Sequence, residues 1–260
     1  MSMGIVMPSR NVEGMVKPVL DQIRKEQWEA IGKIVIVDNG SVDLTLNEIK
    51  QSSAFLEHPN KFHFILNGMD KGYGYSLKTG FDFLSSLLEV KYFVVMHSDD
   101  QFNSDELLDQ YFKLVPDSFD SAAIIAREFG FKYESSLDQL VRNLGNLFIS
   151  LFSRACIAKT VKDINSPFCM FSKELYLDKI KSFHLLDDIL FHPRLNIILA
   201  TSSHLSEGSC SWRRASKTNR APKFRMGFHI VVFFARFGIS YRLRGKDAHE
   251  SYHSALTLFK

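Results

Sequence analysis

Two adjacent carboxylates follow an apolar run in the middle of the chain. The run VVM (residues 94–96) leads into HSDDQ, in which Asp99 and Asp100 stand side by side. Carboxylates held this close repel each other, so a positive group is expected to compensate them. Mg²⁺ prefers oxygen ligands and is commonly held by one or two carboxylates together with substrate phosphates. The pair therefore predicts a site for a metal-bound phosphate compound.

A second interpretation of the pair is structural, because aspartate often caps the N-terminus of a helix. Ser104 suits that role better, since Asp105 and Glu106 follow it at the start of a helical pattern. We favour a functional role for Asp99 and Asp100, because other strand ends in the chain are also acidic or polar.

Four apolar runs in the first half predict the strands that position these residues. They are residues 4–8, 33–40, 62–67 and 91–100, and helical patterns separate them. Such alternation predicts an α/β fold with a mostly parallel central sheet flanked by helices. Ligands of such sheets bind at the carboxyl ends of the strands. Polar segments follow all four runs there, and they are Ser9–Glu13, Asp38–Asp43, Asn67–Lys71 and His97–Gln101.

The second half of the chain is less regular. Its pattern predicts a strand over 121–128, a helix over 137–154, a loop feeding a strand and a helix over 161–177, a last strand over 196–207 and a helix over 226–243. We expect one domain over residues 1–220 and a basic, Phe-rich helical extension over 221–260.

Composition places the chain among globular proteins of the cytoplasm. Its 260 residues are 45% apolar and 23% charged, and the three cysteines show no CxxC spacing. These features indicate a soluble domain in a reducing compartment. The N-terminus lacks the pattern of a signal peptide, and no run of 18 uncharged apolar residues predicts a membrane span.

Positive charge is concentrated near the C-terminus. The net charge is +3, yet Arg213 to Lys246 contains ten Lys or Arg and no Asp or Glu. The segment 226–243 could lie in a bilayer interface as a Phe-rich basic helix, giving peripheral contact at the inner face of a membrane. It could equally pack on the domain or form a contact in a homo-oligomer. Nucleic-acid binding is disfavoured, because no recognised binding motif accompanies the basic cluster.

Four sequence blocks resemble those of family-two glycosyltransferases with the GT-A fold. They are IVMPSRN, KIVIVDNGSVDLT, NGMDKGYGYSLKTGF and HSDDQFNSDEL, within residues 4–107. The last block stands where that family places its D-x-D or D-x-D-D metal motif. The blocks occur in the family's order and spacing, so together they are specific. The resemblance implies a Rossmann-like nucleotide-diphospho-sugar transferase.

A looser similarity extends to about residue 220 and concerns the polyprenyl-phosphate branch of the family. VKDINSPF and WRRASK are similar to motifs of that branch, although Pro167 stands where it prefers glycine. This likeness implies a polyprenyl phosphate as acceptor, held by cationic side chains. The implied catalytic residues are Asp99, Asp163, Arg127, Arg142, Arg214 and Lys217.

The resemblance also implies ligands for the donor and the metal. The implied donor-binding residues are Pro8, Arg10, Asn11, Glu13, Asp38, Asn67, Lys71, Gly72, His97 and Ser98. The implied ligands of Mg²⁺ or Mn²⁺ are His97, Asp99, Asp100 and Gln101. Three positions depart from the family pattern: Arg10 replaces a tyrosine, Val12 a glutamate and His97 the first aspartate of the metal motif.

The implied reaction is inverting transfer of a sugar from a nucleotide-diphosphate donor. A phosphate acceptor is already an anionic nucleophile, whereas a saccharide hydroxyl needs a carboxylate base. Asp163 is our candidate for that base, with a structural role in a turn as its alternative. Transfer to a hydroxyl in surface-polysaccharide synthesis is the second hypothesis. A catalytically silent protein that binds nucleotide sugars is the third.

Overall fold

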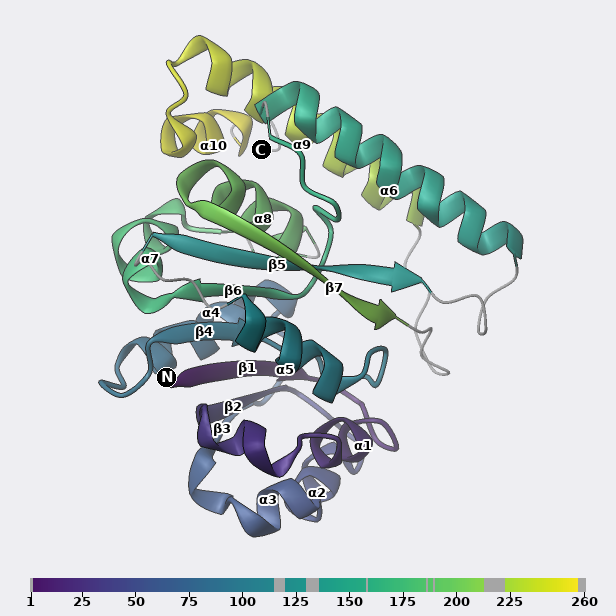
Figure 1. Cartoon of the computed structure of the whole chain (residues 1–260), viewed down its shortest axis with the longest axis vertical. Coiled ribbons are helices and arrows are strands. Elements are labelled where there is room, and N and C mark those ends of the chain that lie inside the picture. The colour runs from purple at the N-terminus through teal and green to yellow at the C-terminus, as the bar shows by residue number, and fades with distance from the viewer. Residues whose placement is uncertain are drawn as a thin grey trace.

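The computed structural model describes residues 2–114, 120–129, 136–157, 159–185, 187–188, 190–212 and 223–256 (Figure 1). A single seven-stranded sheet runs through this part of the chain in the order β3-β2-β1-β4-β6-β5-β7. The strands are β1 (Met3–Ser9), β2 (Ile31–Asn39), β3 (Phe62–Asn67), β4 (Tyr92–Val95), β5 (Ser121–Phe129), β6 (Cys169–Ser172) and β7 (His204–Trp212).

The sheet is mostly parallel, as predicted. Strand β1 pairs in parallel with β2 and β4, β2 with β3, and β5 with β7, whereas β6 is antiparallel to both β4 and β5. Ser9 and Asp38 are neighbours in the register of β1 and β2, so the ends of these two strands lie together. The carboxyl ends of β1 to β4 therefore meet at one edge, which is where the polar segments were expected to converge.

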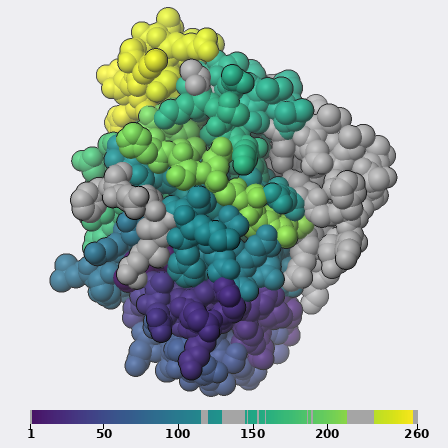
Figure 2. Space-filling view, viewed as in Figure 1, coloured from purple at the N-terminus to yellow at the C-terminus, as the bar shows by residue number. Residues whose placement is uncertain are grey.

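Helices cover both faces of the sheet. The α-helices are α1 (Val16–Asp21), α2 (Thr45–Lys50), α3 (Ser53–Glu57), α4 (Tyr73–Ser85), α5 (Ser104–Lys113), α6 (Ser136–Ile157), α7 (Lys173–Asp178), α8 (Phe191–Ser202), α9 (Lys223–Leu243) and α10 (Ala248–Leu256). Short 3₁₀ helices η1 (Lys25–Glu29), η2 (Pro59–Lys61) and η3 (Ile180–Phe183) connect some of them. In Figure 2 the yellow α10 lies at the end of the molecule opposite the purple N-terminal region.

Two hydrophobic clusters, one on each face, explain why the strands are continuous apolar runs. Along β1, Ile5 belongs to the cluster with α1 and α5, and Val6 belongs to the cluster with α4 and α8. Both residues are fully buried. Alternate side chains of a strand point to opposite faces, so a strand covered on both faces has to be apolar at every position.

The prediction of a strand over 196–207 is wrong in its first half. Residues up to Ser202 belong to α8, and strand β7 begins only at His204. Helix α8 is buried on nearly all sides from Phe191 to Ala200. A helix buried all round loses the polar face that produces a 3.6-residue period, so its apolar run resembles a strand.

The described part of the C-terminal segment packs on the domain. The rings of Phe233, Phe234 and Phe237 in α9 are at most 1% exposed and belong to the same cluster as α4 and α8. Tyr252 of α10 is also fully buried there. These aromatic side chains are core residues and do not face a bilayer. This arrangement agrees with the alternative in which the helix packs on the domain. Across the described residues, none of the helices combines the length and apolar character that a membrane crossing requires.

Candidate active site

A cleft of about 600 Å³ opens at the carboxyl ends of the strands. Its walls come from the loop after β1, the start of α4, the segment after β4 and the segment before α8. Of the residues expected to bind the donor, six line it: Pro8, Arg10, Asn11, Gly72, His97 and Ser98. Asp99 also lines it. The structure therefore brings together residues that are as much as 90 positions apart, such as Pro8 and Ser98, whose Oγ donates a 2.9 Å hydrogen bond to the Pro8 carbonyl.

The loop after β1 is fastened to the loop after β2. The backbone amide of Asn11 donates to Ser41 Oγ, and that of Val12 donates to Thr45 Oγ1, at 3.0 and 2.8 Å. The Asn11 side chain accepts in return from the amide of Val42 at 2.9 Å. Asn11 has a positive φ of 51°, a conformation that asparagine tolerates better than most residues. These contacts fix the rim of the cleft on the side of Arg10.

Asp70 links three strand-end segments, and the sequence analysis did not single it out. Its Oδ1 accepts from Asn39 Nδ2 at 2.6 Å and from the amide of Gly72 at 2.9 Å. Its Oδ2 accepts from the Arg10 guanidinium. Asp70 and Asn39 both line the cleft. The available signal was their place, Asn39 at the end of β2 and Asp70 in the segment that follows β3.

Four of the expected donor-binding residues lie beside the cleft without lining it. Asp38 is 4% exposed, and its Oδ2 accepts from the amide of Ser41 at 3.2 Å. Its buried Oδ1 has no hydrogen-bond partner within the described part of the chain. Glu13 Oε2 accepts from the amide of Leu44 at 3.3 Å. The remaining two are Asn67, bonded to Asn39, and Lys71, whose ammonium lies 4.9 Å from the centre of the Tyr75 ring.

His97 is linked to a second histidine through the hydroxyl group of a tyrosine. The Tyr73 hydroxyl lies 2.6 Å from His97 Nε2 and 2.5 Å from His192 Nε2. A hydroxyl has one proton, so Tyr73 donates to one imidazole and accepts from the Nε2–H of the other. Burial, and next the positive charge of Arg127, lowers the pKa of His97 to about 4. Burial also puts the pKa of His192 well below its ordinary value, so both rings are neutral near pH 7.

The contact with Tyr73 restricts what His97 can do. Its Nε2 is hydrogen-bonded to the Tyr73 hydroxyl, which leaves Nδ1 as the nitrogen available to a ligand. The His97 ring also packs edge-on against Phe168 at 5.7 Å between centroids. The geometry indicates a neutral histidine with one fixed ring orientation where the family places an aspartate.

Asp99 is the carboxylate of the HSDDQ motif that faces the cleft. Burial raises its pKa to about 6, partly opposed by hydrogen bonds from the backbone amides of Gln101 and Asp99 itself, and the charge of Asp100 raises it further. Asp100 and Gln101 do not line the cleft, and Asp100 has a φ of 52°. Strained non-glycine conformations are frequent at functional sites. Here the turn directs the first aspartate, not the second, into the cleft.

The donor set suits a cation that arrives with a diphosphate. The described residues contain no group of three or more His, Cys, Asp and Glu side chains able to hold a metal ion. Mg²⁺ and Mn²⁺ need no such group where substrate phosphates and water complete their coordination. The Asp99 carboxylate, with its raised pKa, is the cleft group that a nearby cation would stabilise most in its charged form.

Arg127 and Asp163 form a buried ion pair outside the lining of the cleft. Arg127 Nε and Nη2 donate to the two carboxylate oxygens at 2.7 and 3.0 Å, and the side chains are 17% and 4% exposed. The guanidinium also lies 5.4 Å from the Trp212 ring centre. Asp163 accepts in addition from the amide of Asn165 at 3.2 Å. The ion pair thus occupies both carboxylate oxygens of Asp163.

The other expected cations cannot be placed at the cleft. The backbone of Arg142 belongs to α6, but its side chain lies outside the described part of the structure. Arg214 and Lys217 also lie outside the described residues.

A second pair of aspartates, Asp187 and Asp188, lines the cleft opposite the strand ends and was missed in the sequence. Asp188 Oδ1 accepts from Arg194 Nη1 at 2.6 Å and from the amide of Leu190 at 3.0 Å. Arg194 is 3% exposed, so a buried cation on α8 anchors a half-exposed carboxylate. Asp187 pairs with Lys78 of α4 at 2.6 Å. The available signal was a pair of adjacent aspartates, as in the HSDDQ motif, although here the pair precedes a helix and does not follow a predicted strand.

The family model for glycosyl transferase family 2 matches residues 4–178, and the chain belongs to this family. The matched region contains all the strand-end segments around the cleft. No curated protein matches the chain in sequence.

Solved structures support the fold at low sequence identity. Glucosyl-3-phosphoglycerate synthase from Mycobacterium tuberculosis in complex with phosphoglyceric acid is 15% identical with a TM-score of 0.61, covering 90% of this chain and 79% of that one. The same synthase with Mn²⁺, UDP and glucosyl-3-phosphoglycerate gives 15% identity and a TM-score of 0.58, covering 94% and 79%. TarS 1–349 from S. aureus gives 12% identity and a TM-score of 0.57, covering 100% and 73%. The chain is a GT-A glycosyltransferase.

Proposed function

We propose that this enzyme transfers a sugar, with inversion, from a nucleoside diphosphate donor to a hydroxyl group of the acceptor. The observation that carries the proposal is the pairing of carboxylates across one cleft. Asp99 lines it from the strand ends, and Asp187 and Asp188 line it from the segment before α8. Transfer to a hydroxyl requires both a group that holds the donor's diphosphate and a separate base.

The donor is assigned to the side of the cleft formed by the strand ends. Asp38 would accept from the base through Oδ1, which is buried and has no partner among the residues that the structure describes, while Arg10 and Asn11 line the neighbouring rim. The solved structures that resemble this chain include complexes with UDP, so a UDP-sugar is the first donor to test. Asp99 would hold Mg²⁺ or Mn²⁺, which neutralises the charge that develops on the leaving diphosphate.

Asp188 is assigned as the base that takes the proton of the acceptor hydroxyl. Its Oδ1 is fixed by Arg194 and Leu190, which sets the direction of the carboxylate, and its side chain remains 46% exposed. Asp163 is unsuited to this role, because both of its oxygens accept from Arg127. The described residues thus offer an anchored carboxylate at the cleft but no cation there besides Arg10.

The test compares two aspartates that differ in assigned role. Asp188→Asn is expected to lower kcat by about 10²–10⁴-fold, the usual contribution of a general base, with little change in KM for the donor. Asp187→Asn is the matched control and is expected to lose less than tenfold, since Lys78 retains its own hydrogen bond to the Leu185 carbonyl at 2.9 Å. Equal losses in the two variants would contradict the assignment of Asp188.

A polyprenyl phosphate is the alternative acceptor, because the implied cations Arg142, Arg214 and Lys217 are not placed by the described structure. The same donor panel should therefore be assayed with saccharide acceptors and with a short-chain polyprenyl phosphate. A phosphate acceptor needs no base, so activity on it that survives Asp188→Asn would favour this alternative. Donor binding without transfer to either acceptor would favour the silent binding protein.

A further inference from the structure

Helix α6 exposes an apolar face that nothing in the described structure covers. Leu147, Phe148 and Leu151 are 55%, 59% and 55% exposed, and they recur at the spacing of one helix face. The opposite face packs on the core through partly buried Ile149 and Phe152, with Ser150 buried beside them. A core helix of a globular enzyme normally has polar residues on its outer face, so this second apolar face needs an explanation.

The neighbouring helix α9 carries two more exposed apolar side chains. Gly238 of α9 lies against Cys156 of α6, where an added Cβ would come within 2.5 Å of the Cys156 side chain. The guanidinium of Arg242 in α9 donates to the Ala155 carbonyl of α6. Ile239 and Leu243 follow Gly238 and Arg242 in α9, and they are 62% and 80% exposed. Figure 1 shows α6 and α9 side by side along one flank of the molecule. We refer to Leu147, Phe148, Leu151, Ile239 and Leu243 as the α6–α9 face.

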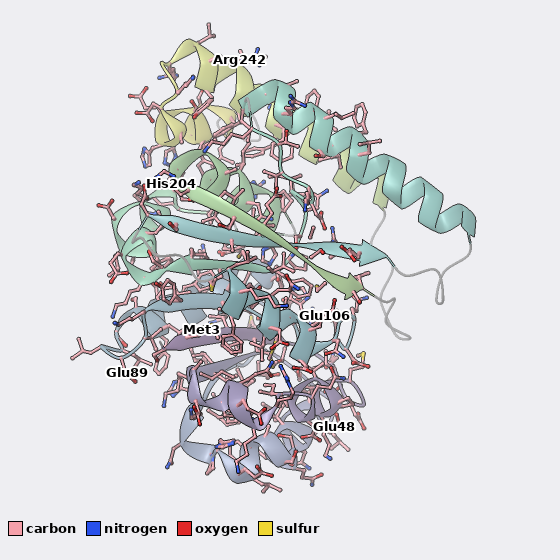
Figure 3. All side chains as sticks on the ribbon, in the orientation of Figure 1. Met3, Glu48, Glu89, Glu106, His204 and Arg242 are labelled. Carbon is pink, nitrogen blue, oxygen red and sulfur yellow. The ribbon has the colours of Figure 1, made fainter. Side chains whose placement is uncertain are left out.

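Exposed arginines lie near the C-terminal ends of both helices that carry the α6–α9 face, and acidic residues are absent from the sequence that forms it. Between Asp138 and Asp163 the sequence contains four Lys or Arg and no Asp or Glu, and all of α9 lacks acidic residues. Arg154 is exposed at the C-terminal end of α6, and Arg242, which Figure 3 labels, is exposed near the end of α9. The face therefore combines exposed Leu, Phe and Ile side chains with exposed arginines on the same two helices.

From this combination we propose that the α6–α9 face binds an anionic lipid bilayer peripherally. Exposed apolar side chains enter the boundary between headgroups and acyl chains, while Arg and Lys side chains extend to the anionic headgroups. A second copy of the chain fits less well, because a two-fold contact would set this positively charged surface against the same surface of the other copy. The surface differs from the one expected from the sequence, since Phe233, Phe234 and Phe237 of α9 are buried in the core.

Vesicle co-sedimentation tests the proposal on the full chain without donor or acceptor, so its result is independent of the proposed reaction. The protein is expected to bind vesicles containing phosphatidylglycerol and to bind pure phosphatidylcholine at least about tenfold more weakly. Binding to the anionic vesicles should fall as salt is raised, because screening weakens the contribution of the arginines. Equal binding to the two compositions, or none to either, would overturn the proposal.

Two variants locate the contact. Phe148→Glu combined with Leu151→Glu should reduce binding to the anionic vesicles at least about tenfold, since charged groups are costly at the acyl boundary. Leu88→Glu is the matched control, because Leu88 is 93% exposed in the segment between α4 and β4 and should leave binding unchanged. Circular dichroism and the Tm establish that both variants fold. The proposal would be overturned if the double variant still binds the vesicles or if Leu88→Glu loses binding equally. It would also be overturned if the unsubstituted protein is a dimer that the double variant, but not Leu88→Glu, converts to a monomer.

Discussion

At the scale of single residues, the structure separates carboxylates that look alike in the sequence. Asp99 faces the cleft and has a pKa raised by burial to about 6. Asp163, in contrast, accepts hydrogen bonds from Nε and Nη2 of Arg127. Asp188 is anchored through one oxygen and remains half-exposed. The environment of each carboxylate, and not its residue type, therefore decides whether it can bind a cation, support the fold or take a proton.

The pair of Arg127 and Asp163 gives a prediction about stability. Arg127→Met should lower the free energy of unfolding by about 3 kcal/mol, because it leaves the buried Asp163 carboxylate without its partner. Lys181→Met is the matched control, since Lys181 and Asp82 also form an ion pair but are 53% and 51% exposed. Exposed pairs contribute only about 0–1 kcal/mol. Urea unfolding measures both, and a similar loss in the two variants would show that burial does not strengthen the Arg127 pair.

At the scale of elements, the cleft depends on how the start of α4 meets the segment before α8. Gly72 precedes α4 with a φ of 93°, and an added Cβ there would lie 2.4 Å from the Asp187 carbonyl oxygen. The carbonyl belongs to the same segment that carries Asp188. Only glycine combines this backbone conformation with so close an approach. Gly72 thereby couples the third strand-end loop to the side of the cleft assigned to the acceptor.

Gly72→Ala should therefore impair transfer more than it impairs folding. We expect kcat/KM to fall by about tenfold or more, since a displacement of about 1 Å at a positioning segment can cost 10²-fold. Gly14→Ala is the control for backbone strain, because Gly14 also has a positive φ, 79°, but no atom lies within 4 Å of its added Cβ. If both variants lose activity equally, strain in the backbone and not contact with Asp187 explains the effect.

At the scale of the whole molecule, donor binding should be coupled to global stability. The cleft gathers loops from β1, β2, β3 and β4, so a ligand that bridges them stabilises the folded sheet as one unit. Any ligand that binds only the folded state raises its stability, by about 2.7 kcal/mol at a concentration of 100 times Kd. The same reasoning applies to a metal that is held jointly by Asp99 and the donor.

Thermal denaturation with UDP tests this coupling. UDP with Mn²⁺ should raise the Tm, and removal of the metal with EDTA should abolish most of the increase. In Asp99→Asn the increase with UDP and Mn²⁺ should shrink to that seen with UDP and EDTA, because the variant loses the charge that holds the cation. The variant should also lose nearly all transfer activity. A full Tm increase in Asp99→Asn would contradict the role of Asp99 in metal binding.

The sequence alone determined the family, the mostly parallel sheet and the polar segments that converge at its edge. These follow from local patterns: a strand covered on both faces must be apolar throughout, and the ligands of parallel sheets generally bind at the carboxyl ends of the strands. The block HSDDQ was recognisable for the same reason, since its residues are adjacent in the chain.

Only the tertiary structure decided which distant side chains meet. It paired Arg127 with Asp163, set Asp187 and Asp188 opposite the strand ends, and joined His97 to His192 through Tyr73. It also buried Phe233, Phe234 and Phe237 of α9 and exposed apolar side chains on α6. Hydrophobic periodicity reports that a helix has an apolar face, but which face becomes buried depends on the elements packed around it.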